Sequence, residues 1–368
     1  MKRSVLMSAH VAVASAVLAA ACGRSEPQPP AAAAARPPAS VPAPPTMPDV
    51  GIYVTNEASG DLTVIDGSTL TPVTTIALGK RPRGIAVSPD GSRLYVALSG
   101  SPNAGPGVDE KTLPPPDRTA DGIGVVDLAR GKLIKVLASG PDPEQVAVSP
   151  DGTQVYVANE DAATATVLDV NTGQIVESFS VGGEPEGVSV EPHNGRVWVT
   201  SEEDGAVFVI DVGAHKVVKP VKVGPRPRSI VFLPDGSRAY VPSETGASLT
   251  VIDVRKLAPI KTINLAAGMR PMGTAVAPDG RHVYVSTGRS QAVLILDTAT
   301  NQVIGSVEAG PRPWGIALSP DATTLYTANG PSNDVSVIDV AGKQVTKKIP
   351  VGTGPWGIIV VKRSSTAR

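Results

Sequence analysis

The sequence is poor in the residues that most often carry redox, metal-binding and base-stacking chemistry. Its 368 residues include one cysteine, four histidines and only 3% aromatic residues. One cysteine excludes an internal disulfide and a Cys-x-x-Cys-His haem attachment, and few aromatic rings leave few platforms for nucleobases. A formal net charge of -1 offers polyanions no general attraction. We therefore expect no nucleic-acid partner.

The part of the sequence after residue 48 also lacks the common motifs of catalysis. It contains no Gly-x-Ser-x-Gly elbow, no phosphate-binding loop and no metal-ligand triad. It also has no helical period, and its apolar runs are only 4 to 6 residues long. We assign no catalytic residue, no metal ligand and no cofactor from the sequence.

The N-terminus predicts export. Lys2 and Arg3 precede an apolar stretch that is too short to span a bilayer, so residues 1–21 read as a signal peptide. Ala19-Ala20-Ala21 then meets Cys22 in a pattern that resembles a bacterial lipobox. That resemblance implies acyl chains on Cys22 and a cell-envelope lipoprotein facing the periplasm or the cell surface. The alternative is ordinary cleavage after Ala21, which would release the protein with a free thiol.

Residues 22–48 are rich in proline and alanine and cannot build a core. Such a composition favours extended chain, so we expect a tether between the membrane and the folded part. Residues 49–363 form that folded part, and residues 364–368 are expected to be a disordered tail.

The folded part is built from one unit that recurs seven times. Aspartates that close short apolar runs lie 61, 42, 42, 42, 44 and 42 residues apart. Seven prolines, from Pro82 to Pro355, recur with the same period and confirm seven units. Within one unit, Ser149-Pro150-Asp151-Gly152 supplies a tight turn between two strands, and two more strands follow. Seven four-stranded units predict an all-β, seven-bladed β-propeller, and we expect it to be a monomer.

Individual repeats resemble those of the YVTN repeat family. Tyr53-Val54-Thr55-Asn56 carries its signature, and Tyr156-Val157-Ala158-Asn159 and Tyr326-Thr327-Ala328-Asn329 are variants. The resemblance implies a seven-bladed propeller but no single activity. The last repeat supplies only an inner strand, at 357–361, so we expect residues 51–78 to add the outer three strands and close the ring.

The connections between blades and the loops from second to third strands should share one face, which we call the top face. Seven mouth residues follow the repeated prolines, at the entrance of the central channel: Arg83, Glu144, Glu186, Arg228, Met272, Trp314 and Trp356. The rim residues precede these prolines, and they are Arg81, Asp142, Glu184, Arg226, Arg270 and Arg312. Because the acids and the arginines group on different blades, a zwitterionic or anionic ligand could bind here. A network of salt bridges that seals the channel is the alternative.

The longest spacing between successive aspartates, 61 residues, contains an insertion at 99–121 on the top face. Its prolines predict a stiff loop that covers the mouth or docks a partner, although a tolerated surface excursion is also possible. Acids recur after the second strands at Glu57, Glu160, Glu202 and Glu244, where we expect ion pairs with the arginines rather than acid–base chemistry.

The histidines favour a binding module over an enzyme. His193, His215 and His282 all fall in bottom-face positions, whereas lactonase-like propellers commonly use a top-face histidine. We therefore predict an exported, membrane-tethered binding or scaffold module that engages a small molecule or a protein through its top face. The alternatives are an enzyme or accessory factor of periplasmic redox and quinone-cofactor metabolism, or a lactonase-like hydrolase without a top-face histidine.

Overall fold

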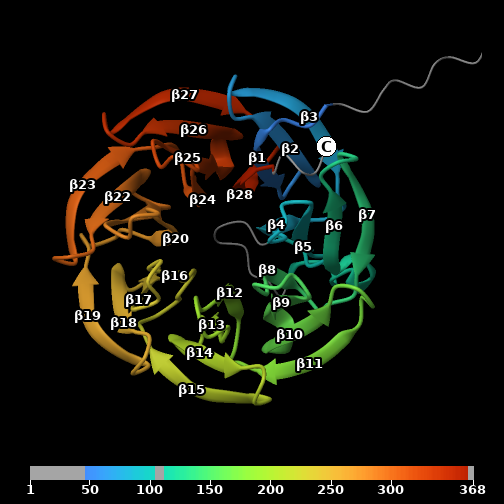
Figure 1. Cartoon of the computed structure of the whole chain (residues 1–368), viewed down its shortest axis with the longest axis horizontal. Coiled ribbons are helices and arrows are strands. Elements are labelled where there is room, and N and C mark those ends of the chain that lie inside the picture. The colour runs from blue at the N-terminus through green and yellow to red at the C-terminus, as the bar shows by residue number, and fades with distance from the viewer. Residues whose placement is uncertain (1–45, 104–111, 364–368) are drawn as a thin grey trace, which may run out of the picture. The chain divides into compact units, whose positions relative to one another are not determined.

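The computed structural model describes residues 46–103 and 112–363. These residues form seven separate four-stranded antiparallel sheets, which are arranged as blades around a central channel (Figure 1). The predicted fold is therefore confirmed. The expected signal peptide, Cys22, most of the linker and the tail at 364–368 lie outside the described residues. Among the described residues, no helix is both long and apolar enough to cross a bilayer.

Each blade runs from an inner strand at the channel to an outer strand at the rim. The first three blades in chain order contain, from the inside outwards, β4 (Pro82–Val87), β5 (Arg93–Leu98), β6 (Gly122–Asp127) and β7 (Lys132–Leu137); β8 (Pro143–Val148), β9 (Gln154–Asn159), β10 (Thr164–Asp169) and β11 (Ile175–Ser180); β12 (Pro185–Val190), β13 (Val197–Ser201), β14 (Ala206–Asp211) and β15 (Lys216–Lys222). The next three contain β16 (Val231–Phe232), β17 (Arg238–Ser243), β18 (Ser248–Asp253) and β19 (Ala258–Asn264); β20 (Pro271–Val276), β21 (His282–Thr287), β22 (Ala292–Asp297) and β23 (Gln302–Glu308); β24 (Pro313–Leu318), β25 (Thr324–Asn329), β26 (Asp334–Asp339) and β27 (Gln344–Pro350).

The seventh blade joins the two ends of the ring, as the sequence predicts. Its inner strand is β28 (Pro355–Lys362), and its outer strands are β1 (Val50–Asn56), β2 (Asp61–Asp66) and β3 (Thr71–Ala77). β1 pairs with β28 from Val50 opposite Lys362 to Asn56 opposite Pro355. Met47, at the end of the predicted linker, is buried in the core beside this blade. This closure pairs the outer side of β28 with β1 and joins the two ends of the ring in one sheet.

The hydrophobic core lies between neighbouring blades. Second and third strands are buried on both faces, so Tyr53, Tyr95 and Tyr240 and the β-branched residues around them are almost fully excluded from solvent. Outer strands alternate between exposed and half-buried residues instead. The repeat therefore stacks sheet on sheet, and each blade depends on its neighbours for burial.

In most repeats a glycine follows the proline and the mouth residue, which gives the pattern Pro-x-Gly. Close packing of one blade on the next explains these glycines. A Cβ atom on Gly315 would lie 2.5 Å from the carbonyl oxygen of Trp356, and one on Gly357 would lie 2.5 Å from that of Arg83. Only glycine lets the backbone of one blade approach the mouth residue of the next blade so closely.

The periodic aspartates serve turns, as the sequence indicates. The Oδ1 atom of Asp169 accepts hydrogen bonds from the backbone amides of Asn171 (2.9 Å) and Thr172 (2.7 Å), and Asp66 accepts in the same way from Ser68 and Thr69. These bonds favour the ionised carboxylate and lower the pKa of both groups. The residues close the bottom-face turns and are not part of the mouth.

One inner strand is shorter than its six equivalents. β16 contains only two residues, and Pro227 and Arg228 contact β17 through an isolated bridge and one hydrogen bond from Arg228 N to Pro242 O (3.2 Å). The carbonyl of Pro242 faces the inner strand. The N–H and C=O of one residue in a strand point to the same side, so the amide hydrogen that Pro242 lacks would also have faced the inner strand. Pro242 therefore removes a ladder hydrogen bond and ends the regular pairing before the mouth.

Candidate functional site

The two kinds of top-face loop are joined by a repeated backbone hydrogen bond. The amide after the second strand donates to the carbonyl of the rim residue: Glu160 to Asp142 (2.9 Å), Glu202 to Glu184 (3.0 Å) and Glu244 to Arg226 (2.9 Å). This bond places each acid that follows a second strand beside a rim residue. The acids and the arginines therefore meet on the top face because the backbone brings their loops together.

Buried hydroxyl groups fix the backbone of the mouth. Thr55 donates to the carbonyl of Arg83 (2.7 Å) and accepts from the amide of Gly357 (2.8 Å). Ser286 is its equivalent in another blade, where it donates to the carbonyl of Trp314 (2.8 Å). Each hydroxyl group thus links its own blade to the mouth residue of the next one.

The first ionic group surrounds Arg83. This guanidinium pairs with the fully buried Glu144, lies 3.6 Å from Glu57 and lies 3.9 Å from Glu160. Arg81 completes the group, since its Nε is 2.9 Å from Glu57. Glu160 belongs to the short 3-10 helix η3 (Glu160–Ala162) and makes no side-chain hydrogen bond to any described residue. Its carboxyl is therefore the group here that can still bind a water molecule or a ligand.

The second ionic group surrounds Arg228. Its guanidinium is 2.7 Å from Glu186 and 2.5 Å from Glu244, and it also pairs with Glu202. Arg226 lies 2.5 Å from Glu202, and Arg270 lies 3.0 Å from Glu244. The salt-bridge network that the sequence offered as an alternative is therefore present on this side of the mouth.

The carboxyl groups of these two clusters have different proton affinities. Burial raises the pKa of Glu160 from 4.5 to about 7, against the opposing effect of Arg83. Burial and the neighbouring Glu186 raise the pKa of Glu202 to about 9. Burial also acts on Glu244, but Arg228 and Arg270 outweigh it and lower the pKa of that carboxyl. Burial therefore favours the protonated forms of Glu202 and Glu160, whereas the arginines favour the ionised form of Glu244.

Two tryptophans form an apolar wall between the ionic groups. The rings of Trp314 and Trp356 lie 5.6 Å apart, and Trp356 faces the guanidinium of Arg83 at 5.4 Å. Trp314 is contacted by two guanidinium groups, that of Arg228 at 5.4 Å and that of Arg312 at 5.0 Å. The interaction of a cation with the face of an indole ring is favourable, and it is stronger where water is excluded.

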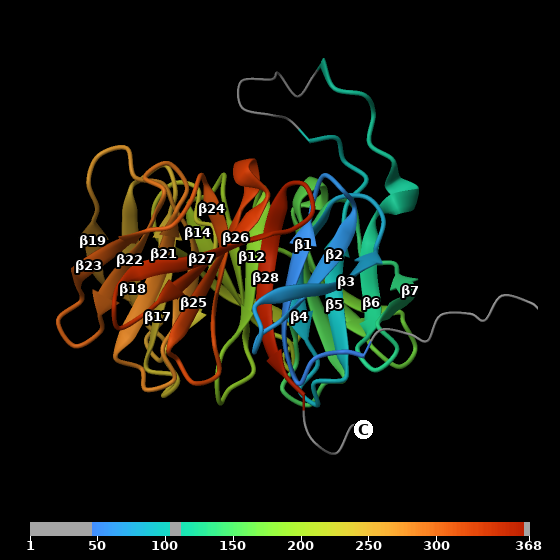
Figure 2. The same cartoon turned by 90° about the horizontal axis from the view of Figure 1, so that it is seen from above.

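The insertion is anchored to the top face at its base. Figure 2 shows its described part, in teal, above one end of the ring. Gly100 donates to Asp121 (2.6 Å), Asp121 also accepts from the amide of Asp142 (3.2 Å), and Arg81 donates to the carbonyl of Ser101 (2.6 Å). Arg118 begins the short 3-10 helix η2 (Arg118–Ala120) and pairs with Asp161 of the next blade. The predicted position of this loop between β5 and β6 is correct.

A cavity of about 710 Å³ lies between the mouth and the insertion. Its wall includes nine of the thirteen mouth and rim residues predicted from the sequence, namely Arg81, Arg83, Asp142, Glu186, Arg226, Arg228, Arg312, Trp314 and Trp356. The other four lie elsewhere: Glu144 is buried behind Arg83, Met272 lines a narrower space of about 130 Å³ in the channel, and Glu184 and Arg270 are outside the cavity wall.

Sequence reasoning did not assign several wall residues to the site. Glu57 and Glu160 were expected to pair with arginines, and both do, Glu57 with Arg81 at 2.9 Å and Glu160 with Arg83 at 3.9 Å. The Glu160 carboxyl is nevertheless 28% exposed and lines the cavity. Pro114, Pro115 and Pro116 of the insertion also line the cavity. The repeat period gives each acid its loop, but it does not indicate which of them remain accessible.

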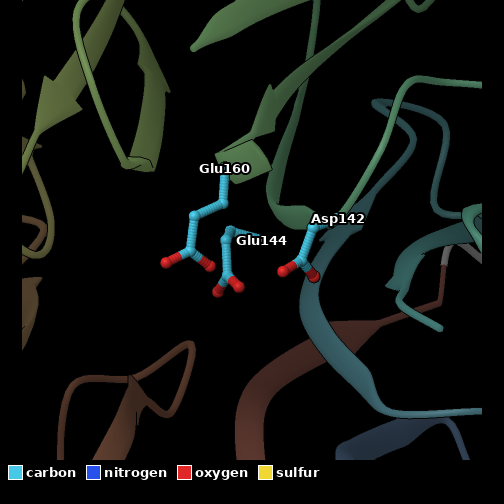
Figure 3. A group of neighbouring side chains, drawn as sticks. All are labelled: Asp142, Glu144 and Glu160. Atoms are coloured by element: carbon cyan, nitrogen blue, oxygen red, sulfur yellow. The ribbon is translucent and has the colours of Figure 1, made fainter. Parts of the chain in front are cut away.

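Three carboxyl groups lie close enough together to share a cation. Oxygens of Asp142, Glu144 and Glu160 lie within 4.8 Å of one another, and Figure 3 shows the three side by side at the mouth. Asp142 also accepts a hydrogen bond from Ser99, and Arg83 pairs with Glu144. The guanidinium of Arg83 therefore already supplies positive charge to this group.

The described histidines lie away from this cavity. His193 and His215 occupy the turns after β12 and β14, and His282 begins β21, so all three are at the bottom face. The prediction from the repeat period is confirmed. Among the described residues, the cavity wall contains carboxyl groups and no histidine.

Comparison with known families matches two sequence models to parts of the ring. The family described as YNCE-like beta-propeller matches residues 108–239, and the family described as Lactonase, 7-bladed beta-propeller matches residues 187–348. The chain is a seven-bladed β-propeller, and parts of its ring are similar to the lactonase and YNCE-like families. No curated protein matches this propeller in sequence.

Several solved structures resemble the propeller. A periplasmic gluconolactonase from Pseudomonas aeruginosa is 20% identical, with a TM-score of 0.69 over 86% of this chain and 99% of that one. Hydrazine synthase from Kuenenia stuttgartiensis is 20% identical, with a TM-score of 0.66 over 77% of this chain and 90% of that one. A functionally unknown protein from Desulfotomaculum acetoxidans is 16% identical, with a TM-score of 0.70 over 85% and 99%. At these identities the likeness establishes the fold alone.

Proposed function

We propose that the top-face cavity binds a lactone of the sugar-acid type and hydrolyses it. The observation that carries this proposal is Glu160: a partly exposed carboxyl in the cavity wall, 3.9 Å from Arg83, with its pKa raised to about 7. A general base works best when its pKa lies near the working pH. The match to the lactonase family and the likeness to a gluconolactonase give the reaction class.

The proposed step uses only groups of this chain. Ionised Glu160 removes a proton from a water molecule, whose oxygen attacks the lactone carbonyl. The guanidinium of Arg83 stabilises the negative oxygen of the tetrahedral intermediate. The ring carbon–oxygen bond then breaks, the leaving oxygen takes the proton back from Glu160, and the open hydroxy acid is released. The rings of Trp314 and Trp356 offer an apolar wall for the sugar ring.

The test is hydrolysis of a panel of δ- and γ-aldonolactones at pH 7, measured by acid release after the spontaneous rate is subtracted. Glu160→Gln keeps the size of the side chain but cannot accept the proton, so kcat/KM should fall by roughly 10²- to 10⁴-fold. Glu203→Gln is the matched control, because Glu203 is exposed on the same face but does not line the cavity. Equal rates for the wild type and E160Q would contradict the proposal. Lactone binding without turnover would favour the binding-module alternative.

We propose in addition that the protein acts outside the cytoplasm, held to a membrane by acyl chains on Cys22. The support is the sequence Ala19-Ala20-Ala21-Cys22 after a short apolar stretch, followed by a proline-rich tether. Mass spectrometry of the mature protein should detect an acylated Cys22. In a separate assay, the mature protein should partition into detergent. A soluble mature protein with an unmodified cysteine would exclude the anchor.

A further inference from the structure

Arg312 differs from the other arginines of the cavity wall in having no acidic partner. The other four each pair with a carboxylate, namely Arg81 with Glu57, Arg83 with Glu144, Arg226 with Glu202 and Arg228 with Glu186. In the described part of the chain, no carboxylate oxygen lies within 4.0 Å of the Arg312 guanidinium, whose one ring contact is with Trp314. Among the described residues, therefore, no acid neutralises its positive charge.

The backbone directs this charge into the cavity. Arg312 is the rim residue before Pro313, where its φ of 47° places it in the left-handed region, and both Arg312 and the adjacent Trp314 line the cavity. Trp314 is itself held by the hydrogen bond from Ser286 to its carbonyl. The indole thus provides a fixed surface on which the guanidinium rests, with its donor edge free.

A stacked guanidinium with free donors is suited to one kind of group. Its planar N–H fork matches the two oxygens of a carboxylate or phosphate, and charge-assisted bonds of this geometry are about twice as strong as neutral ones. Arg228 contacts the same indole at 5.4 Å, but its charge is already paired with Glu186 and Glu244, so Arg312 supplies the unpaired positive charge on this side of the described cavity wall. Glu160 and Asp161 lie in the wall formed by the second blade, so the cavity has a basic side and an acidic side.

We propose that Arg312 and Trp314 form a subsite for a negatively charged substituent, a carboxylate or a phosphate, carried by the ligand of this cavity. This inference rests on the proposed function for the position of the rest of the ligand. The sugar ring lies against Trp314 and Trp356, and its charged substituent points to Arg312. A ligand bound this way has a fixed orientation, because its anionic end is repelled from the side that carries Glu160 and Asp161.

The experiment measures binding of three sugars that share a ring and differ only at carbon 6: glucose, glucuronate and glucose 6-phosphate. None is a lactone, so calorimetry reports binding without turnover. We expect the wild-type protein to bind glucuronate, glucose 6-phosphate or both at least tenfold more tightly than glucose. The two charged sugars separate a carboxylate ligand from a phosphate ligand.

Substitution of Arg312 localises the effect. Arg312→Gln should remove the preference for the charged sugar, and Arg312→Lys should keep part of it, because lysine retains the charge without the fork. Arg289→Gln is the control: Arg289 is exposed in a top-face turn, does not line the cavity and should leave the preference unchanged. Unchanged thermal unfolding of each variant confirms that it is folded.

Equal affinity for the three sugars, no measurable binding of any of them, or an equal loss in R312Q and R289Q would overturn the subsite. These outcomes are separate from those of the hydrolysis test. Glu160-dependent hydrolysis with no preference for charged sugars would keep the proposed function and remove this inference. A preference that depends on Arg312 in a protein that hydrolyses no lactone would do the reverse.

Discussion

The protonation of Glu202 gives a prediction that depends on no ligand. This carboxyl is buried against Arg228 and Arg226, and the carboxyl of Glu186 lies nearby. Its pKa is raised from 4.5 to about 9. The neutral acid is therefore the stable form at pH 7. Glu202→Gln replaces it with a neutral group of the same shape, so the substitution should cost little near neutral pH.

The expected magnitude follows from proton linkage. Between pH 4.5 and about 9 the native protein keeps the proton of Glu202, whereas the unfolded chain has released it. Because the folded pKa is the higher one, the stability from this group is fully present at low pH and is lost as the pH rises towards 9. The loss is about 1.4 kcal/mol per pH unit. From pH 6 to pH 8 the wild type should therefore lose roughly 3 kcal/mol that E202Q does not lose.

The assay is urea unfolding of the wild type and E202Q at pH 6, 7 and 8, followed by tryptophan fluorescence. The difference in unfolding free energy between the two proteins should move by roughly 3 kcal/mol in favour of E202Q over this range. Glu203→Gln alters the adjacent exposed residue and should track the wild type at every pH. A difference between the wild type and E202Q that does not change with pH would refute the reasoning. A constant loss of about 3 to 5 kcal/mol would instead indicate an ionised Glu202 whose removal takes away the close partner of Arg226 and one of the partners of Arg228.

Three further predictions concern the frame and the proposed base. Gly315→Ala places a Cβ atom 2.5 Å from a backbone carbonyl and should lower the unfolding free energy by about 1 to 3 kcal/mol, whereas Gly213→Ala, which has room, should not; equal urea midpoints would contradict this. Ser286→Ala leaves buried backbone groups unpaired and should cost about 1 to 3 kcal/mol and alter the fluorescence of Trp314; an unchanged spectrum would show that the hydroxyl does not position the ring. Hydrolysis by Glu160 requires the ionised form, so kcat/KM should rise with pH through about 7 and be roughly 50-fold lower at pH 5 than at pH 7; a flat profile would exclude this base.

Much of the fold could be predicted from the sequence because the determinants of a blade are local and repeated. Turn aspartates, Pro-x-Gly steps and β-branched runs recur in register, so the repeat assigns each residue to a strand or to a face. The shortening of β16 could also have been predicted, since Pro242 stands where the equivalent second strands carry a residue with an amide hydrogen. The closure by β1 and β28 followed from counting incomplete repeats.

The pairing at the mouth was only partly predictable. Arg228 and Glu186 are one repeat apart, so opposite charges at successive mouth positions are a signal that adjacent blades will pair. Which carboxyl is protonated is not visible in the sequence, because Glu160, Glu202 and Glu244 have equivalent positions but different burial and different cationic neighbours. The cavity depends on how the insertion packs over the mouth, and the repeat period carries no information about that.

The backbone of the rim gives Arg312 a second testable property. Its φ of 47° is unfavourable for any residue with a Cβ atom. The rim residues Arg81, Asp142, Glu184 and Arg226 share this conformation, so it belongs to the frame of the repeat, and the seventh repeat places Gly354, with a φ of 68°, at the equivalent position. Arg312→Gly and Arg312→Ala both remove the guanidinium, but in this conformation the glycine variant should be the more stable by about 1 kcal/mol, the reverse of the usual order. Both variants should lose the preference for charged sugars. If urea unfolding shows the alanine variant to be as stable as the glycine variant, the backbone stores no strain at this position.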